Sequence, residues 1–450
     1  MKKRSNRSAS MQKRFNKIYI IIPCGLILLA GAVLLGLYLN GFFYNRKDIQ
    51  AKAVASPEEI AVLAQDTKIV PADMLSRIRS LLLGKTNTSP FIVSWYALPG
   101  TISSVKELQS EYLITTDQIN LLRYYIKTGN KDSAKQLSNG IAEDFTGESG
   151  FLVSGRNVSE LTSLSAPQPV FPANAAYEES SVMTAQSMET TVEYVRALLE
   201  YYEKWGQAAD WTHIEKLADL LYTGDAGFTE DLTITAAAPS LVPTGENQDI
   251  VSAVEGQVTT GGTFTTLSLS SLDLEVFRML GLADSKYQPM YDKALEILSG
   301  ALISEDLPLY AIGYSQSSAG YVYYSDADAQ ADLITSLKIT LHLAEEGKAS
   351  KNTLLWIKEQ LYNQGMLYKS YNLISGQATT TEESVEAYGI LLQIAREVDD
   401  ADLYSKALER LEWHLATNSS SKAKSAVFRQ LDGSRVIVYA NDNLETLLGV

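Results

Sequence analysis

The 450-residue sequence predicts an all-α protein: a closed (α/α)6 barrel of six helical hairpins, with short β-hairpins on its connections, preceded by one N-terminal transmembrane helix. Three observations support this prediction: a long uncharged run near the N-terminus, helical hydrophobic periodicity that recurs six times, and aromatic strand-like segments between the helices. The expected order is a basic tail (1–17), the transmembrane helix (18–39), a linker or stalk (40–70) and the barrel (71–450).

The N-terminal segment predicts the topology. Residues 18–39 form an uncharged run of 22 residues, and at about 1.5 Å per residue such a helix spans about 33 Å, enough to cross a bilayer core. The preceding seventeen residues are basic and contain no acidic side chain, which predicts that they stay cytoplasmic and that the barrel lies outside the cell. A cleaved signal peptide is the competing interpretation, but its apolar region is usually about 7–15 residues long.

The remainder of the chain is strongly acidic. None of the 53 acidic residues but nine of the 38 basic ones lie in the first 47 positions, so the rest carries a net charge of −24. Such a surface repels nucleic acid, which we exclude as a partner. Cys24 is the only cysteine, so no disulfide within the chain can stabilise the outer domain.

Two kinds of helix alternate from residue 71 onward. Amphipathic, outer helices are expected at 71–84, 131–145, 208–222, 286–302, 350–363 and 401–415. More apolar, inner helices are expected at 116–128, 188–204, 271–282, 326–346, 381–397 and 442–450. Because a single pair cannot bury its apolar face alone, repeated pairs predict a stacked or closed array. Closure would place helix 71–84 against helix 442–450.

The connections from outer to inner helices carry strand-like, aromatic segments at 91–96, 151–154, 228–235, 309–324, 366–374 and 427–439. Four of their aromatic residues are candidates for stacking on sugar rings: Trp95, Tyr96, Tyr324 and Tyr371. Packing beneath the connections is an equally good explanation for such residues.

The sequence excludes several kinds of chemistry. The histidines, His213, His342 and His414, lack metal-ligand spacing, and no nucleotide-binding fingerprint occurs. We therefore expect neither a metal nor a cofactor. Carboxylates beside aromatic residues are typical of carbohydrate enzymes, in which one carboxyl donates a proton and another activates water or attacks.

Acidic residues gather where the inner helices are expected to start, and these starts would converge on one mouth of a barrel. Asp117, Glu189, Asp273 and Asp326 belong to this set. Helix capping is the alternative explanation, since segment 115–118 (Thr-Thr-Asp-Gln) resembles a capping box.

Several sequence stretches in the expected helices resemble a known protein family, and the resemblance covers about residues 110–450. It lies in Ser271-Leu-Asp-Leu-Glu-Val-Phe-Arg-Met-Leu280, Leu341-His-Leu-Ala-Glu-Glu-Gly347, Leu355-Trp-Ile-Lys358, Glu383-Ser-Val-Glu-Ala-Tyr388 and Arg196-Ala-Leu-Leu-Glu200 with Lys204-Trp-Gly206. These stretches resemble the membrane-anchored, exopolysaccharide-associated branch of glycoside hydrolase family 8.

The resemblance implies a six-hairpin barrel, hydrolysis of a β-glycan and exopolysaccharide synthase components as partners. It implies Asp117 as proton donor and Asp273 as base, with Glu189, or alternatively Glu193, assisting at the cleavage subsite. Asp326, at another expected helix start, is a candidate for substrate binding. In an inverting mechanism Asp117 and Asp273 would face each other about 6.5–9.5 Å apart. Thr190 and Thr191 stand where the family has paired aspartates.

Three functions therefore stay open at this stage. The first is a membrane-tethered, extracellular hydrolase acting on a polysaccharide. The second is a catalytically inactive, glycan-binding or assembly subunit of a polysaccharide synthesis system. The third is a helical scaffold for a protein partner, which predicts a broad apolar surface patch.

Overall fold

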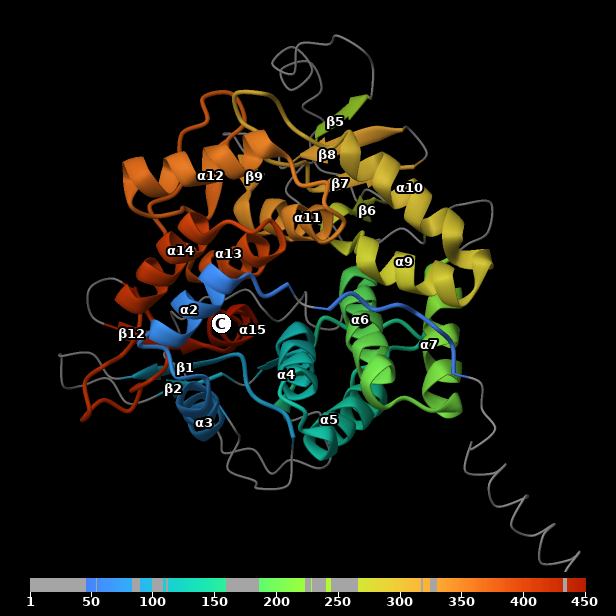
Figure 1. Cartoon of the computed structure of the whole chain (residues 1–450), viewed down its shortest axis with the longest axis horizontal. Coiled ribbons are helices and arrows are strands. Elements are labelled where there is room, and N and C mark those ends of the chain that lie inside the picture. The colour runs from blue at the N-terminus through green and yellow to red at the C-terminus, as the bar shows by residue number, and fades with distance from the viewer. Residues whose placement is uncertain are drawn as a thin grey trace, which may run out of the picture.

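A computed structural model places the helices and strands of the chain (Figure 1). It describes residues 46–53, 55–82, 90–98, 108–110, 112–158, 186–222, 228, 240–243, 266–316, 319–323, 330–431 and 435–450. The predicted basic tail and transmembrane helix, Tyr324, Asp326 and all but the first residue of the predicted strand-like segment 228–235 lie outside these residues. Within the described ranges, no helix is long and apolar enough to cross a bilayer.

The six predicted hairpins are confirmed. The outer helices are α3 (Pro71–Leu82), α5 (Lys131–Asp144), α7 (Ala208–Leu221), α10 (Gln288–Ser299), α12 (Lys351–Gln364) and α14 (Ala401–Trp413). The inner helices are α4 (Thr115–Lys127), α6 (Met188–Trp205), α9 (Leu274–Ala283), α11 (Leu333–Glu345), α13 (Val385–Glu397) and α15 (Ala440–Gly449).

The inner helices form a closed ring. Each contacts its neighbours in chain order, and α15 packs against both α4 and α3, as closure requires. The ring is tight between α13 and α15, because a Cβ added at Gly389 would lie 2.5 Å from the backbone carbon of Glu445. Only a residue without a side chain lets the two helices approach this closely.

Three inner helices begin later than predicted, and local structure explains each case. Residues 269–271 form a 3₁₀ turn before α9, and Asp273 caps that helix by accepting the N–H of Val276 at 3.1 Å. Strand β9 (Gln330–Asp332) precedes α11. Helix α13 starts only after Ser384. Strand pairing and turns therefore take up residues that helical periodicity alone assigned to the helices.

The connections from outer to inner helices form small antiparallel sheets. One four-stranded sheet has the order β11 (Arg429–Leu431), β12 (Arg435–Tyr439), β1 (Trp95–Leu98), β2 (Leu108–Gln109), with Trp95 opposite Tyr439. A second sheet has the order β5 (Ser240–Pro243), β8 (Gly320–Tyr323), β7 (Gly313–Ser315), β6 (Leu267–Ser268). Strand β3 (Tyr112–Ile114) pairs with β4 (Gly155–Asn157), and β9 pairs with β10 (Ser370–Asn372).

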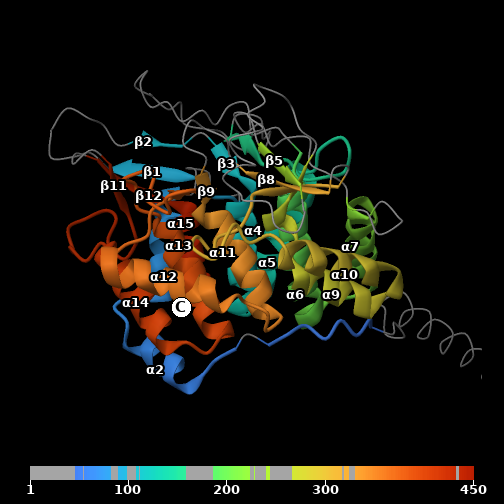
Figure 2. The same ribbon diagram turned by 90° about the horizontal axis from the view of Figure 1, so that it is seen from above.

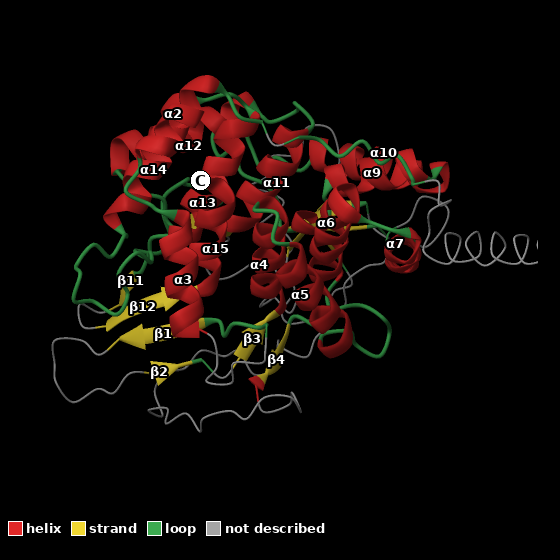
Figure 3. Cartoon of the chain, turned by 60° about the horizontal axis from the view of Figure 1, so that its bottom comes forward, coloured by secondary structure: helices red, strands yellow, loops and turns green. Residues whose placement is uncertain are grey.

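These strands lie together on one face of the barrel, where the inner helices begin (Figures 2 and 3). The connections therefore surround a mouth at the N-terminal ends of the inner helices, as predicted. The predicted strand at 151–154 is displaced, since residues 152 and 153 make only isolated bridges and the strand proper is β4.

Residues 46–53, which we call the N-terminal strap, cross the opposite face (Figure 2). Ile49 is fully buried, the N–H of Lys47 donates to the Tyr202 hydroxyl at 2.8 Å, and the N–H of Lys52 donates to Glu275 at 3.0 Å. Helix α2 (Glu58–Asp66) then packs on α14, with Ile60 buried. The described part of residues 46–70 therefore packs on the barrel, because buried apolar side chains such as Ile49 and Ile60 outweigh a polar composition.

Candidate functional site

The inner helices line a polar cavity below the mouth of the barrel, which we call the mouth cavity. Its volume is about 50 Å³, too small to enclose a sugar ring, so a glycan would have to lie across its opening. The lining comes from the N-terminal halves and middle turns of the inner helices and includes four carboxylates, Glu189, Glu193, Asp273 and Glu445. The structure thus brings two of the three predicted catalytic residues, Glu189 and Asp273, to one place.

Asp117 does not line this cavity, although it is buried. Helix α4 begins at Thr115, and its inward stripe consists of Thr116, Asn120 and Arg123, spaced by four and three residues. The Thr116 hydroxyl donates to Glu193 at 2.8 Å. Asp117 is turned away from this stripe by one residue, which is about 100° around the helix.

The alternative explanation of Asp117 as part of a capping box is wrong. The residue at the N-cap of α4 is Ile114, and no side chain caps the helix there. The Thr115 hydroxyl instead donates to the carbonyl oxygen of Val153 at 2.6 Å.

Lys338 on α11 joins the two glutamates of α6. Its ammonium group lies 2.9 Å from Glu189 Oε1 and 2.8 Å from Glu193 Oε1. Burial disfavours the charged form of Glu189, but the Lys338 ammonium outweighs it and holds the pKa of Glu189 below its usual value. Glu189 is therefore ionised at neutral pH and is not a proton donor.

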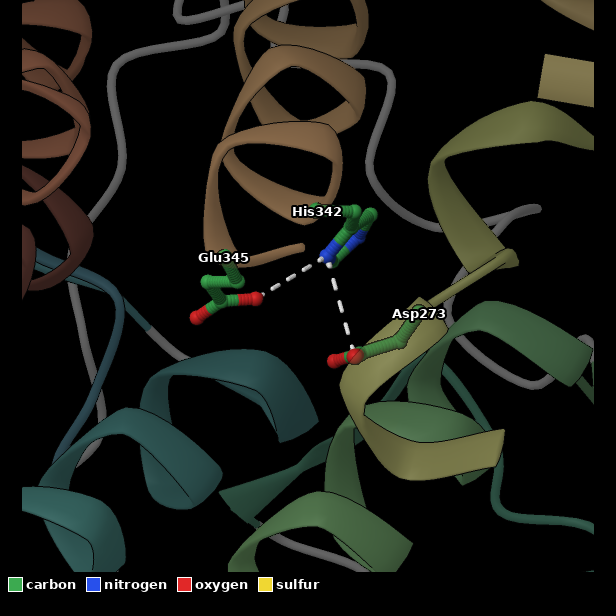
Figure 4. A group of neighbouring side chains, drawn as sticks. All are labelled: Asp273, His342 and Glu345. Atoms are coloured by element: carbon green, nitrogen blue, oxygen red, sulfur yellow. Dashed lines mark ion pairs between the residues drawn. The ribbon is translucent and has the colours of Figure 1, made fainter. Parts of the chain in front are cut away.

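Asp273 takes part in a second ion cluster, with Arg196, Glu345 and His342. Arg196 Nη1 lies 2.9 Å from Asp273 Oδ2, and the same guanidinium binds both carboxylate oxygens of Glu345. His342 Nε2 lies 3.1 Å from the carbonyl oxygen of Ser270, and its Nδ1 points between Asp273 and Glu345 at 3.8 and 3.9 Å (Figure 4). Arg196 thus fixes the position of the Asp273 carboxyl group beside the cavity.

The same cluster is the one group of potential metal ligands among the described residues. One ligand atom each from Asp273, His342 and Glu345 lies within 4.8 Å of the others. The spacing argument missed this group because Asp273 is distant in sequence from the other two. The Arg196 guanidinium already binds both carboxylates, so it supplies the positive charge that a metal ion would bring.

Sequence reasoning missed two carboxyls that hold protons more tightly than usual. Burial, with the nearby carboxylates of Glu445 and Asp442, raises the pKa of Glu386 to about 7. Burial also raises the pKa of Glu445, whose oxygens accept from the neutral amides of Asn120 at 2.7 Å and Gln393 at 2.8 Å. The only sequence signal for these residues is their position on the inward face of α13 and α15.

The predicted stacking residues have different environments. Tyr371 is 1% exposed and packs edge-on against Trp356, with ring centroids 4.8 Å apart, so it belongs to the core rather than to an accessible rim. Trp95 is also buried, in a small cluster with Ala97, Ile437 and Tyr439. Tyr96 is half-buried on β1. Packing explains Trp95 and Tyr371.

Comparison with known proteins gives a likeness of fold. No protein-family model matches the sequence, and no curated protein matches it. Among solved structures, an α-amylase from Clostridium perfringens is 19% identical with a TM-score of 0.60, covering 85% of this chain and 98% of that one. PssZ from Listeria monocytogenes is 13% identical with a TM-score of 0.51, covering 84% and 95%.

A family 8 glycoside hydrolase from Teredinibacter turnerae, solved as a xylobiose complex, is 10% identical with a TM-score of 0.50, covering 87% of this chain and 95% of that one. At these identities the comparison establishes the fold alone. The chain has the (α/α)6 fold of six-hairpin glycosidases, including family 8, and the predicted resemblance is confirmed at that level.

Proposed function

We propose that the protein is a glycoside hydrolase-like protein that cleaves a β-linked exopolysaccharide at the mouth of the barrel. The observation that carries this proposal is the group of four carboxylates, Glu189, Glu193, Asp273 and Glu445, that converges on one cavity at the strand-covered face of the barrel. Carboxylates in contrasting environments are what acid and base catalysis of glycoside cleavage requires.

In this proposal Asp273 is the base that activates water. Its ion pair with Arg196 and its position at the N-cap of α9 fix its orientation. Glu189 assists by binding sugar hydroxyls next to the cleaved bond. The proton donor is Glu445 rather than Asp117, because Glu445 lines the cavity and burial raises its pKa.

A second candidate function, glycan binding without cleavage, rests on a specific observation. Lys338 already engages both Glu189 and Glu193, and Thr116 occupies the inward position at the start of α4. The mouth would then hold a glycan chain for a polysaccharide synthesis system without breaking it.

Reducing-sugar release distinguishes the two candidates. Full-length protein would be incubated with β-glucans, chitosan and partly deacetylated glycans, beside Asp273→Asn, Glu445→Gln and Glu296→Gln. Glu296 is an exposed residue of α10 and serves as the matched control. If the protein is a hydrolase, wild type and Glu296→Gln should release reducing sugar, and Asp273→Asn and Glu445→Gln should not. Retained glycan binding in a pull-down without release by wild type would support the second candidate instead.

We further propose that residues 18–39 anchor the barrel to the outside of the cell membrane. The uncharged run and the basic segment before it support this location. In cell fractionation the full-length chain should sediment with membranes, and protease added to intact cells should degrade the barrel. A barrel that stays protected until the cells are lysed would contradict the proposed orientation.

A further inference from the structure

A second and larger cavity lies at the other end of the barrel, beneath the N-terminal strap. Its volume is about 410 Å³, and it shares Arg123, Arg196, Leu341 and Gln393 with the mouth cavity. The C-terminal ends of the inner helices and strap residues 51–53 form its walls. We call it the rear cavity. Its charged lining residues are Lys52, Arg123, Lys127, Arg196, Lys204 and Arg396, with Glu200, Glu275, Glu345 and Glu397.

Every carboxylate of the rear cavity already has a cationic partner. Glu200 binds Arg123 at 2.8 Å and Arg196 at 3.3 Å. Glu345 also binds Arg196. The other two are Glu397, which binds Lys52 of the strap at 2.8 Å, and Glu275, which binds Arg278 at 2.7 Å.

Three cations of the cavity have no such counter-charge. Lys127, Lys204 and Arg396 form no ion pair with a carboxylate side chain of the described residues. Lys127 donates to the carbonyl oxygens of Leu447 and Leu448 at 3.2 and 2.9 Å and to an oxygen of Val450, the last residue, at 2.7 Å. Lys204 donates to the carbonyl oxygens of Ile126 at 2.5 Å and Lys127 at 3.4 Å. These contacts satisfy helix ends, which is an ordinary structural role for lysine.

Arg396 has no comparable role. Within the described part of the chain, its guanidinium makes one hydrogen bond, to the Tyr404 hydroxyl at 3.4 Å, and its guanidinium carbon lies 5.5 Å from the centre of that ring. The positive charges also repel one another. Lys127 is exposed along part of its side chain, but its ammonium group is largely shielded from water. This burial, together with repulsion from Arg396 and Arg123, lowers the pKa of Lys127 to about 7.

We propose that the rear cavity is a binding site for a phosphate group, held by Lys127, Lys204 and Arg396 and covered by the N-terminal strap. A phosphate oxygen accepts charge-assisted hydrogen bonds from ammonium and guanidinium groups and supplies the negative charge that no carboxylate side chain of the described residues brings to these three cations. Lys127 and Lys204 are exposed, so an anion reaches them from solvent. The site is separate from the glycan site and does not depend on it.

Calorimetric titration with inorganic pyrophosphate tests this site on the full-length protein. The variant is Lys127→Gln with Arg396→Gln, and the matched control is Lys293→Gln with Lys406→Gln, two lysines that bind glutamates on their own helices. We expect one site in wild type and in the control, and at least about tenfold weaker binding in the variant. No binding by wild type, or equal affinity in the variant, would overturn the proposal.

Two further measurements keep the result interpretable. Arg396→Lys retains the charge but not the planar guanidinium, so it should lose less affinity than Arg396→Gln. Equal losses in the two variants would contradict a role for the charge. Circular-dichroism melting shows whether each variant is folded. Reconstitution in phosphatidylcholine nanodiscs with and without phosphatidylglycerol distinguishes the source of the phosphate. A site for a lipid headgroup should bind pyrophosphate more weakly when phosphatidylglycerol is present, because the lipid competes. An affinity for pyrophosphate that phosphatidylglycerol does not change indicates a soluble phosphate compound.

Discussion

Removing the ammonium of Lys338 tests the electrostatic organisation of the mouth. In Lys338→Met the aliphatic stem is replaced by one of similar length, while Glu189 and Glu193 lose the cation that lies 2.9 and 2.8 Å from them. The three side chains are 20%, 27% and 23% exposed. Exposed pairs contribute about 0.2–1 kcal/mol, and breaking a buried pair costs about 3–5 kcal/mol. Because the Lys338 pairs are intermediate in exposure, we expect Lys338→Met to lower the free energy of unfolding by about 2–3 kcal/mol at pH 7.

Differential scanning fluorimetry would measure this loss. With an unfolding entropy of about 2.1 cal/mol/K per residue and a barrel of roughly 380 residues, 2–3 kcal/mol corresponds to a fall in Tm of about 3–4 °C. Lys293→Met, which removes an exposed pair with Glu296, should change Tm by less than about 1 °C.

The loss in Lys338→Met should also depend on pH. Because the pKa of Glu189 in the folded protein lies below its usual 4.5, the stabilisation by Lys338 is present above that value and is lost as pH falls through the folded pKa. The difference in Tm between wild type and variant should therefore shrink below about pH 4.5. A variant as stable as wild type at pH 7, or an equal loss at pH 7 and pH 4, would refute this reasoning.

Three further predictions concern other parts of the fold. Glu386→Gln should become more stable relative to wild type as pH rises from about 5 to 8, by about 3 kcal/mol at most. The reason is that Glu386 has a pKa of about 7 in the folded protein, so the wild type loses stability across that range. Melting temperatures of both proteins, measured against pH, test this. Gly389→Ala should destabilise by about 1–3 kcal/mol, because the added methyl group meets the backbone at Glu445, and chemical denaturation of the variant checks this. Ile49→Ala should cost about 2–4 kcal/mol, because this side chain is fully buried, and limited proteolysis should then cut the strap first. Unchanged stability in any of these variants would contradict the packing or charge described for it.

The hairpins could be predicted from sequence because each inner helix carries apolar residues on several faces, and each outer helix on one. In α14, Leu403, Ala407, Leu408 and Leu411 are buried at helical spacing, as the pattern requires. The strap could not be predicted, because its binding to the barrel depends on one apolar side chain, Ile49, on backbone hydrogen bonds and on ion pairs of Arg46 and Lys52 with glutamates distant in sequence.

The candidate site was predictable only in part, for a geometric reason. Asp273 could be found because it stands at the start of an inner helix. Asp117 also stands at such a start, but a difference of one position rotates a side chain by about 100° and takes it off the inward face. Glu386 and Glu445 gain their raised pKa from burial among residues of other helices, and a single sequence does not show which helices meet.

The most direct test of the central claim is a crystal structure of Asp273→Asn with a bound oligosaccharide, chosen from the glycan that binds best in the pull-down. We predict a sugar ring across the opening of the mouth cavity, with hydroxyl groups within hydrogen-bond distance of residue 273 and Glu189. An oligosaccharide bound only elsewhere on the protein, with the mouth empty at a saturating concentration, would contradict the claim that this mouth is the glycan site.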